Sequence, residues 1–323
     1  MPYKTIKHLV QMNIDRLKEL TQKHTLIKAA LYPAIISKRL LLKKKDSLLQ
    51  KKMQWQKEVL DNLGEMLIGD PIIRVNEFNG IFSVDSHSDI FGRVIIDLCY
   101  EEKLSKLCLK YLDINKDVID VGANIGLYTV MFAKNLSPQK KVLSVEPTKN
   151  ALQRLRRNIE MNGVVNKVEI FEGVASDNNG SAEIKVIKGK EEYSSLGEML
   201  HPWITNEKWI LEKVISTTLD KLVDEKSLNP GFLKVDVEGA EHLVFKGAGK
   251  VLSEKRPIIL SELSDFLLNR NGSSAMEVID IIKSHGYDVF DPINPSVQPG
   301  IEAFGDIMCF PKEMNVLDIN AVN

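Results

Sequence analysis

Cysteine is scarce in this chain, with only Cys99, Cys108 and Cys309 among 323 residues. Three cysteines cannot all pair with one another and none lies in a CxxC motif, so neither a disulfide framework nor a zinc site is expected. The six histidines are scattered and form no HExxH motif. We therefore expect no bound metal and a reducing compartment.

Long hydrophobic runs are also missing. The most apolar early stretch, residues 29–36, is far shorter than the ~20 residues that span a bilayer. The first thirty residues contain six lysines and arginines, so they hold no apolar core of a signal peptide. These absences predict a soluble, cytoplasmic protein.

The total charge of −1 hides an uneven distribution. Residues 1–60 hold 14 basic and 4 acidic side chains, a net charge of +10, whereas the other 263 residues hold 29 and 40, a net charge of −11. Residues 38–52 are cationic and partly apolar, which is typical of a solvated helix face, or of a surface that docks peripherally on a membrane or on an acidic protein. Nucleic acid is disfavoured as a partner, because the negative body would repel phosphates and no RNA-binding motif is visible.

Apolar periodicity divides the chain into a helical extension, residues 1–70, and a larger domain, residues 71–323. The extension has apolar residues at three- and four-residue steps, which predicts two amphipathic helices broken near Pro33. In the domain core, residues 116–290, strand and helix patterns alternate, which predicts an α/β fold with a doubly wound, mostly parallel sheet. The expected strands cover 72–75, 80–84, 118–121, 141–145, 168–171, 182–187, 232–235, 258–260 and 306–310, and the expected helices cover 90–111, 126–134, 148–161 and 275–284.

Residues 188–214 interrupt this alternation and are rich in Trp, Ser and Glu. Such an insertion predicts a lid or substrate loop, and several of its side chains are of types that stack on and hydrogen-bond to sugars. A surface loop with its aromatic residues packed onto the body is the alternative. The side chains concerned are Tyr193, Ser194, Ser195, His201, Trp203 and Trp209.

A glycine-containing turn joins the predicted strand 118–121 to a helix. Gly122 and Gly126 leave room for a ligand against the turn, and Glu146 ends the next strand, where a carboxylate can bind both hydroxyls of a ribose. The turn lacks the GxGxxG spacing that holds a pyrophosphate, and Asp120 before it suits a cationic amino group. S-adenosylmethionine (SAM), which has an ammonium group and no phosphate, is therefore favoured over NAD. The alternative is a turn whose glycines serve packing alone.

A second group of acids follows the strand 232–235. Asp236 and Glu238 reach the carboxyl edge of the sheet, where either could orient an acceptor hydroxyl or remove its proton, or the two could hold a divalent ion. Glu262, just past the strand 258–260, and His242 are further candidates for the base. Alternatively Glu238 caps the next helix, Asp236 binds backbone amides, Glu241 is a solvated or capping residue, and His242 is a packing residue. We favour no metal, since companion ligands are absent from the sequence pattern.

Several separated segments closely resemble the FkbM family of methyltransferases: DVGANIG at 120–126, VEP at 145–147, ASD at 175–177, TTLD at 217–220 and KVDVEGAE at 234–241. The likeness covers about residues 79–290 and leaves the basic extension outside. It implies a Rossmann-like class I fold with an antiparallel last strand. It also implies SAM-dependent methylation, usually of an oxygen on a sugar, a glycan or a secondary metabolite.

The resemblance also implies roles for individual residues. Gly122, Asn124 and Gly126 would line the methionine end of SAM, and Asp120 would reach its amino group directly or through water. Glu146 would bind the ribose, while Val174 and Asp177 would border the adenine. Two rival hypotheses remain open, namely methylation of nitrogen or of nucleic acid, and a non-catalytic binding module that retains the fold.

Overall fold

The computed structural model describes residues 50–56, 58–60, 62–67, 69–187, 194, 208–293 and 305–314. The chain divides into two compact units, Met1–Leu63 and Gly64–Asn323, a few residues before the predicted end of the extension. The first predicted N-terminal helix, most of the basic residues 38–52 and most of the predicted lid lie outside the described residues. The end of the second predicted helix is described, and residues 50–56, 58–60 and 62–66 are helical there. In the part of the chain that is described, every helix is too short or too polar to cross a membrane.

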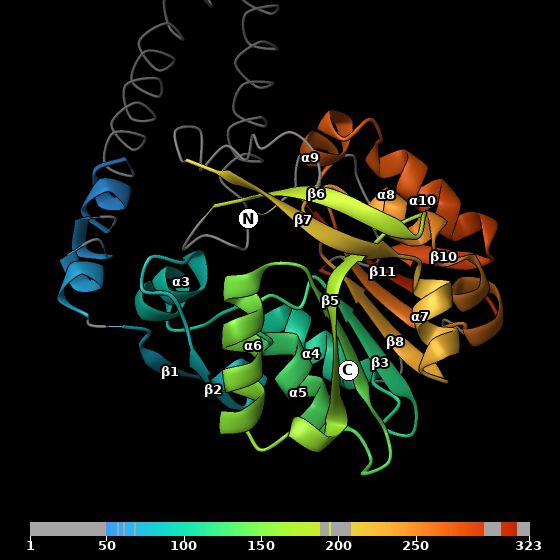
Figure 1. Ribbon diagram of the computed structural model, residues 1–323, viewed down its shortest axis with the longest axis horizontal. Coiled ribbons are helices and arrows are strands. Elements are labelled where there is room, and N and C mark those ends of the chain that lie inside the picture. The colour runs from blue at the N-terminus through green and yellow to red at the C-terminus, as the bar shows by residue number, and fades with distance from the viewer. Residues whose placement is uncertain are drawn as a thin grey trace, which may run out of the picture. The chain divides into compact units, whose positions relative to one another are not determined.

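The second unit is built on a large sheet. Its strands are β3 (Asp117–Val121), β4 (Val142–Glu146), β5 (Val168–Ala175), β6 (Gly180–Val186), β7 (Ile210–Thr217), β8 (Pro230–Val235), β9 (Ile258–Leu263), β10 (Tyr287–Phe290) and β11 (Gly305–Pro311). Within the described residues these strands form one nine-stranded sheet, in the order β10-β11-β9-β8-β3-β4-β5-β7-β6 (Figure 1). The six strands from β9 to β7 are parallel, while β6, β10 and β11 each run antiparallel to a neighbour. The predicted doubly wound sheet with an antiparallel last strand is therefore confirmed.

Helices cover both faces of this sheet. They are α3 (Asp89–Asp97), α4 (Glu102–Tyr111), α5 (Leu127–Asn135), α6 (Lys149–Met161), α7 (Leu219–Glu225), α8 (Glu241–Lys246), α9 (Asp265–Arg270) and α10 (Ala275–Ser284), with the short segments η1 (Asn76–Phe78), η2 (Val165–Lys167) and η4 (Val251–Lys255). The helices α4, α5 and α6 lie on one face, and α7, α8 and α10 lie on the other (Figure 1). A separate hairpin of β1 (Ile72–Val75) and β2 (Gly80–Ser83) packs on α5 and α6.

Burial explains why the central strands read as short apolar runs. Every residue of β3, β4 and β8 is buried, because both faces of a doubly wound sheet are covered by helices. All residues from Leu127 to Ala133 in α5 are buried as well, since this helix is enclosed by the sheet on one side and by β2 and η1 on the other. The polar residues that remain inside, including Asp120 and Lys234, are therefore exceptions that need a reason.

Three predicted boundaries are wrong. The expected helix 90–111 is broken into α3 and α4, because Leu98 and Glu101 both adopt left-handed backbone conformations. The predicted lid ends earlier than residue 214, since residues from Ile210 onward form β7, which lies in the sheet between β5 and β6. Glu262 lies inside β9 and pairs with Asp306 of β11, whereas the sequence placed it beyond the strand.

Candidate active site

A cavity of about 320 Å³ lies at the carboxyl ends of the central parallel strands, a size within the usual range of small-molecule sites. One end lies over β3, β4 and β5 and is lined by residues predicted to bind the cofactor; we call it the cofactor end. The other end lies over β8 and β9 and beside the turn between α3 and α4; we call it the acceptor end. The cofactor end includes Gly122, Asn124, Glu146 and Val174, and the acceptor end includes Arg93, Tyr100, Glu101, Lys234, Asp236, Glu238 and Glu262.

Seven of the predicted site residues thus line one cavity, and four do not. Asp120 is a buried residue of β3 and Gly126 precedes α5; these two, Asp177 and His242 are not among the lining residues. His242 is buried, and burial followed by the charge of Lys246 lowers its pKa. The structure therefore does not bring His242 together with the carboxylates, and its role as a base stays a prediction.

The glycine turn is shaped by close packing within the protein. Gly122 has a φ of +74°, and a Cβ built there would lie 1.8 Å from the backbone oxygen of Asp236. Gly126 has a φ of +89°, and its Cβ would lie 2.4 Å from the Leu155 Cδ1 atom. Packing against backbone therefore requires glycine at position 122, whereas at position 126 the left-handed φ favours glycine and the Leu155 side chain could move aside. Gly122 serves the cavity as well, because its backbone forms part of the wall.

Glu146 holds the cofactor end in shape. Its Oε2 atom accepts a hydrogen bond of 2.9 Å from the backbone amide of Asn124, and its Oε1 atom accepts from the amide and the hydroxyl of Thr148. Burial raises the pKa of Glu146, and these hydrogen bonds oppose the rise. A carboxylate fixed in this way at the end of β4 presents an oriented acceptor to a ligand.

Asp120 lies beneath the turn. Its Oδ2 atom accepts a hydrogen bond of 2.6 Å from the Thr129 hydroxyl, whereas its Oδ1 atom accepts none within the described residues and lies 3.8 Å from the Lys234 Nζ atom. Burial raises the pKa of Asp120, and the nearby charge of Lys234 opposes the rise. The structure thus places Asp120 against Lys234, and contact with the amino group of SAM stays a prediction.

Lys234 is a residue of the site that the sequence analysis missed. Its Nζ atom lies 3.1 Å from Asp236 Oδ2, donates to the backbone oxygen of Gly122 at 3.3 Å, and lies 5.1 Å from the centre of the Tyr128 ring. Burial acts to lower the pKa of this lysine, but the surrounding acids, Asp236, Asp120 and Glu101, together outweigh it and raise the pKa overall. The available signal was a charged residue within an otherwise apolar strand, Phe232-Leu233-Lys234-Val235.

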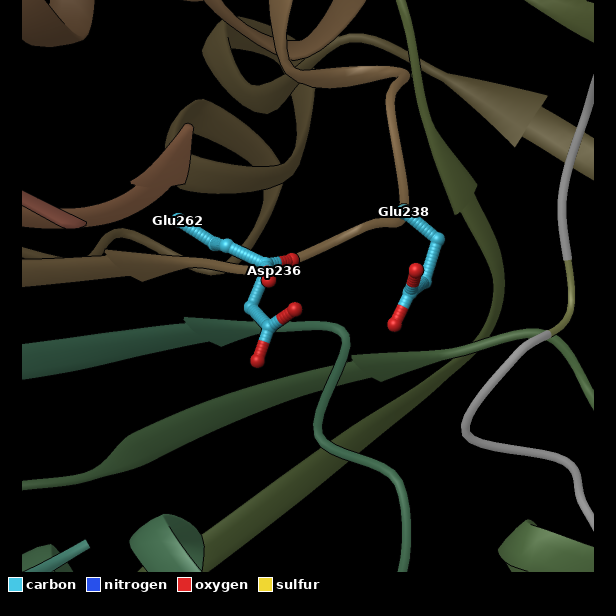
Figure 2. Close-up of side chains that lie close together, drawn as sticks. All are labelled: Asp236, Glu238 and Glu262. Carbon is cyan, nitrogen blue, oxygen red and sulfur yellow. The ribbon is translucent and has the colours of Figure 1, made fainter. Parts of the chain in front are cut away.

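Three carboxylates meet at the acceptor end. Oxygens of Asp236, Glu238 and Glu262 lie within 4.8 Å of one another, and Figure 2 shows the three side chains together. Burial raises the pKa of Glu262 well above its usual value, and the charges of Asp236 and Glu238 add to the rise. Oxygen ligands of this kind suit a divalent cation, but the Lys234 ammonium already places a positive charge against Asp236. The expectation that the site works without a metal stays a prediction.

The segment after β8 is shaped by Glu241. This buried carboxylate accepts hydrogen bonds from the backbone amides of Val237 and Gly239, which fits the expectation of a capping residue but not of a solvated one. Burial raises its pKa to about 7. Held this way, the segment places Glu238, whose φ is +54°, in the cavity wall.

Helix α3 and the turn between α3 and α4 were also missed as parts of the site. Arg93, Tyr100 and Glu101 line the acceptor end, and the Tyr128 hydroxyl donates a hydrogen bond of 2.9 Å to Glu101. Burial and then the charge of Asp236 raise the pKa of Glu101. No motif marks these residues in the sequence, because only the folded chain brings them beside β8.

Part of the chain is similar to a known family and to curated proteins. The sequence model described as "Methyltransferase FkbM domain" matches residues 120–289. Methyltransferase sdnD of Sordaria araneosa is 27% identical over 150 residues, which are 46% of this chain and 51% of that protein. Methyltransferase 1 of Beauveria bassiana is 26% identical over 178 residues, which are 50% of this chain and 65% of that protein. The chain thus spans between half and two thirds of the length of these curated relatives.

A solved structure described as methyltransferase FkbM from Methylobacillus flagellatus is 16% identical with a TM-score of 0.41, and the match covers 62% of this chain and 44% of that one. The family match covers more than half of the chain and includes the turn at Gly122, Glu146 and the acids after β8. The chain belongs to the FkbM family of methyltransferases.

Proposed function

We propose that this chain is a SAM-dependent methyltransferase that methylates an oxygen of a sugar, a glycan or a secondary metabolite. The observation that carries the proposal is that one cavity joins Glu146 and the Gly122 turn to Asp236. Matches to proteins named methyltransferases support it. A cofactor site next to an acidic group is the arrangement that alignment and deprotonation of a hydroxyl require.

The residues of the cofactor end suit SAM. Glu146 Oε2 accepts one hydrogen bond, from Asn124, among the described residues, and a carboxylate oxygen has room for a second donor such as a ribose hydroxyl. Gly122 and Asn124 would hold the methionine end, and Val174 would border the adenine. Bound SAM supplies a methyl group on a positively charged sulfonium.

Asp236 is our choice for the group that receives the proton of the acceptor hydroxyl. Its side chain is 38% exposed and lines the cavity, and Lys234 holds its Oδ2 atom at 3.1 Å. A carboxylate with one oxygen held by a buried ammonium keeps the other directed at a ligand. Glu238 and Glu262 lie close enough to orient the same acceptor.

Calorimetry with SAM and the full chain tests the cofactor. We expect binding, and we expect Glu146→Gln to weaken it about tenfold, because a charged acceptor is lost from the ribose. Glu172→Gln is the matched control, since Glu172 is an exposed partner of Arg156. Failure of SAM to bind at about 1 mM would remove the proposal.

Methyl transfer is tested with methyl-labelled SAM and extracts of small molecules, glycans and RNA. Label in an alkali-stable ether of a small molecule or glycan is the expected result. Label on nitrogen or in RNA would favour the first rival hypothesis. SAM binding without transfer to any fraction would favour a non-catalytic binding module.

We also propose that residues 38–52 dock the enzyme on an anionic membrane surface, where a lipid-linked glycan would be an acceptor. This segment holds Lys38, Arg39, Lys43, Lys44, Lys45, Lys51 and Lys52. Clustered cations beside apolar residues bind anionic headgroups. We expect the chain to co-sediment with vesicles that contain phosphatidylserine, and we expect this binding to be lost when these seven residues are replaced by Gln. Equal binding by the variant would refute the proposal. A solvated helix face or a surface for an acidic protein would then remain as the alternatives.

A further inference from the structure

Helix α3 and the turn between α3 and α4 form one wall of the acceptor end. Arg93, Tyr100 and Glu101 line the cavity there, opposite the segment that follows β8. These three residues precede the part of the chain that the family model matches, which begins at residue 120. Residues of this wall can therefore determine which acceptor this particular chain prefers.

Some residues of the cavity wall have a left-handed backbone conformation. In the described part of the chain, seven residues other than glycine have a positive φ, and three of these line the cavity: Glu101 at +47°, Asn124 at +49° and Glu238 at +54°. Left-handed backbone is unfavourable for glutamate and persists where the surroundings impose it, which occurs most often at functional sites. Glu101 thus shares this feature with two residues already assigned to the site.

A structural role in helix capping does not explain Glu101. It occupies the position before the first residue of α4, yet its side chain makes no capping hydrogen bond to that helix. Its Oε2 atom instead accepts from the Tyr128 hydroxyl at 2.9 Å, and its Oε1 atom lies 3.8 Å from Arg93 Nη1. The carboxylate is therefore oriented beside the cavity, and each oxygen can accept a further donor.

The charges of the wall exclude one class of acceptor. Four carboxylates, Asp89, Glu101, Asp236 and Glu238, and two cations line this side of the cavity among the described residues, besides Glu262, whose pKa is raised by burial. Both cations have carboxylate neighbours: Lys234 lies 3.1 Å from Asp236, and Arg93 lies 3.8 Å from both Asp89 and Glu101. The Arg93 guanidinium is also stacked 4.3 Å from the centre of the Tyr100 ring. An acceptor with a carboxylate or a phosphate would meet unbalanced negative charge here.

We propose that Glu101 binds a hydrogen-bond donor of the acceptor, and that the acceptor is a hydroxyl-rich, sugar-like molecule without negative charge. The donor is a hydroxyl in a neutral sugar or an ammonium in an amino sugar; both complement the carboxylates of this wall. Acidic and phosphorylated sugars are excluded by the same carboxylates. This inference rests on the proposed methyltransferase function and adds the substrate class and the residue that selects it.

The test uses the full chain loaded with S-adenosylhomocysteine and three probes at about 10 mM, observed by saturation-transfer NMR. The probes are methyl α-glucopyranoside, its 2-amino analogue and its uronic acid. We expect the neutral sugar, the amino sugar or both to bind, and the uronic acid not to bind. Binding of the uronic acid at equal or greater strength, or binding of none of the three, would overturn the proposal.

The role of Glu101 itself is tested by Glu101→Gln. Glutamine keeps the side-chain length and can still accept the Tyr128 hydrogen bond, so a merely structural role would be rescued. We expect at least a tenfold loss of probe binding with unchanged affinity for S-adenosylhomocysteine. Glu102→Gln is the matched control, because Glu102 is the next residue, is exposed, and pairs with Lys106 at 2.7 Å. Equal probe binding by both variants would contradict the assignment.

The two proposals fail in different ways. If S-adenosylhomocysteine and SAM do not bind to the unaltered chain, the methyltransferase function is wrong. If they bind normally and the probes behave contrary to expectation, only the acceptor class and the role of Glu101 are wrong.

Discussion

The ammonium of Lys234 lies 3.1 Å from the carboxylate of Asp236 and 3.8 Å from that of Asp120. The lysine side chain is 8% exposed and Asp120 is fully buried, so one buried cation stands between an acid below the turn and an acid in the cavity. Lys234 therefore contacts both a buried acid of the sheet and an acid that lines the acceptor end.

Replacing this cation is expected to destabilise the fold. Lys234→Met fills the space but leaves Asp120 as an unpaired buried charge, and we expect a loss of about 3 kcal/mol in the free energy of unfolding at pH 7. Because protonation of the carboxyls relieves this loss, the deficit should shrink toward pH 4. Urea denaturation at both pH values measures it, and a deficit that does not depend on pH would contradict the ion-pair explanation.

Asp236→Asn tests the proposed base. The amide keeps the size of the side chain but cannot take up a proton, so turnover should fall about 100-fold or more while the dissociation constant of SAM stays the same. The measurement is the initial rate with the acceptor found by the labelled-methyl screen. Asp280→Asn, a substitution of an exposed residue on α10, is the control. If Asp236→Asn retained its turnover, Asp236 would not be the base and another carboxylate would have to take that role.

A comparison of two glycines distinguishes the stability cost of a left-handed backbone from the cost of steric overlap. Gly122 and Gly272 have nearly equal φ values, +74° and +75°, but a Cβ at Gly272 meets nothing within 4 Å, whereas one at Gly122 meets the Asp236 oxygen at 1.8 Å. We expect Gly272→Ala to cost about 1 kcal/mol and Gly122→Ala at least about 3 kcal/mol more. Thermal and urea unfolding of both variants provide the comparison, and similar losses would show that the overlap is relieved by movement of the chain.

The pH dependence of stability should carry a contribution from Glu241. Burial raises its pKa from 4.5 to about 7, so the folded chain binds this proton more tightly than the unfolded chain does. The contribution to stability is therefore fully present below pH 4.5 and is lost as the pH rises to 7, by about 3 kcal/mol. In Glu241→Gln this part of the decline should vanish, while Glu160→Gln, on the exposed side of α6, should leave it in place.

Removal of metal ions should not change methyl transfer. The carboxylates of Asp236, Glu238 and Glu262 are close enough to bind a cation, but Lys234 supplies a positive charge beside Asp236. We expect equal rates before and after treatment with EDTA, measured with labelled SAM. Activity that disappears with EDTA and returns with Mg²⁺ or Mn²⁺ would instead make the three carboxylates a metal site.

Much of the fold could be predicted because its signals are local. Short apolar runs such as Phe232–Val235 mark strands covered on both faces, and the intervening helices have the amphipathic spacing seen in α6. The cofactor end could be predicted for the same reason, since Gly122 and Glu146 directly follow or end such strands. Strand β7 was hidden by the polar insertion before it, and the break at Leu98 to Glu101 was hidden by helical periodicity that continues across it.

The alternation of strands and helices, the family, the glycine turn after β3 and the acids at the carboxyl ends of β4 and β8 could all be read from the sequence. The folded chain was needed to show which side chains share the cavity. It turned Asp120 and His242 away from the lining and brought Glu101 from an unmarked turn to the acceptor end. The residues at the end of a strand are positioned by the alternation of side chains along that strand, which the sequence shows. Contacts between distant segments depend instead on how the helices pack across the sheet edge.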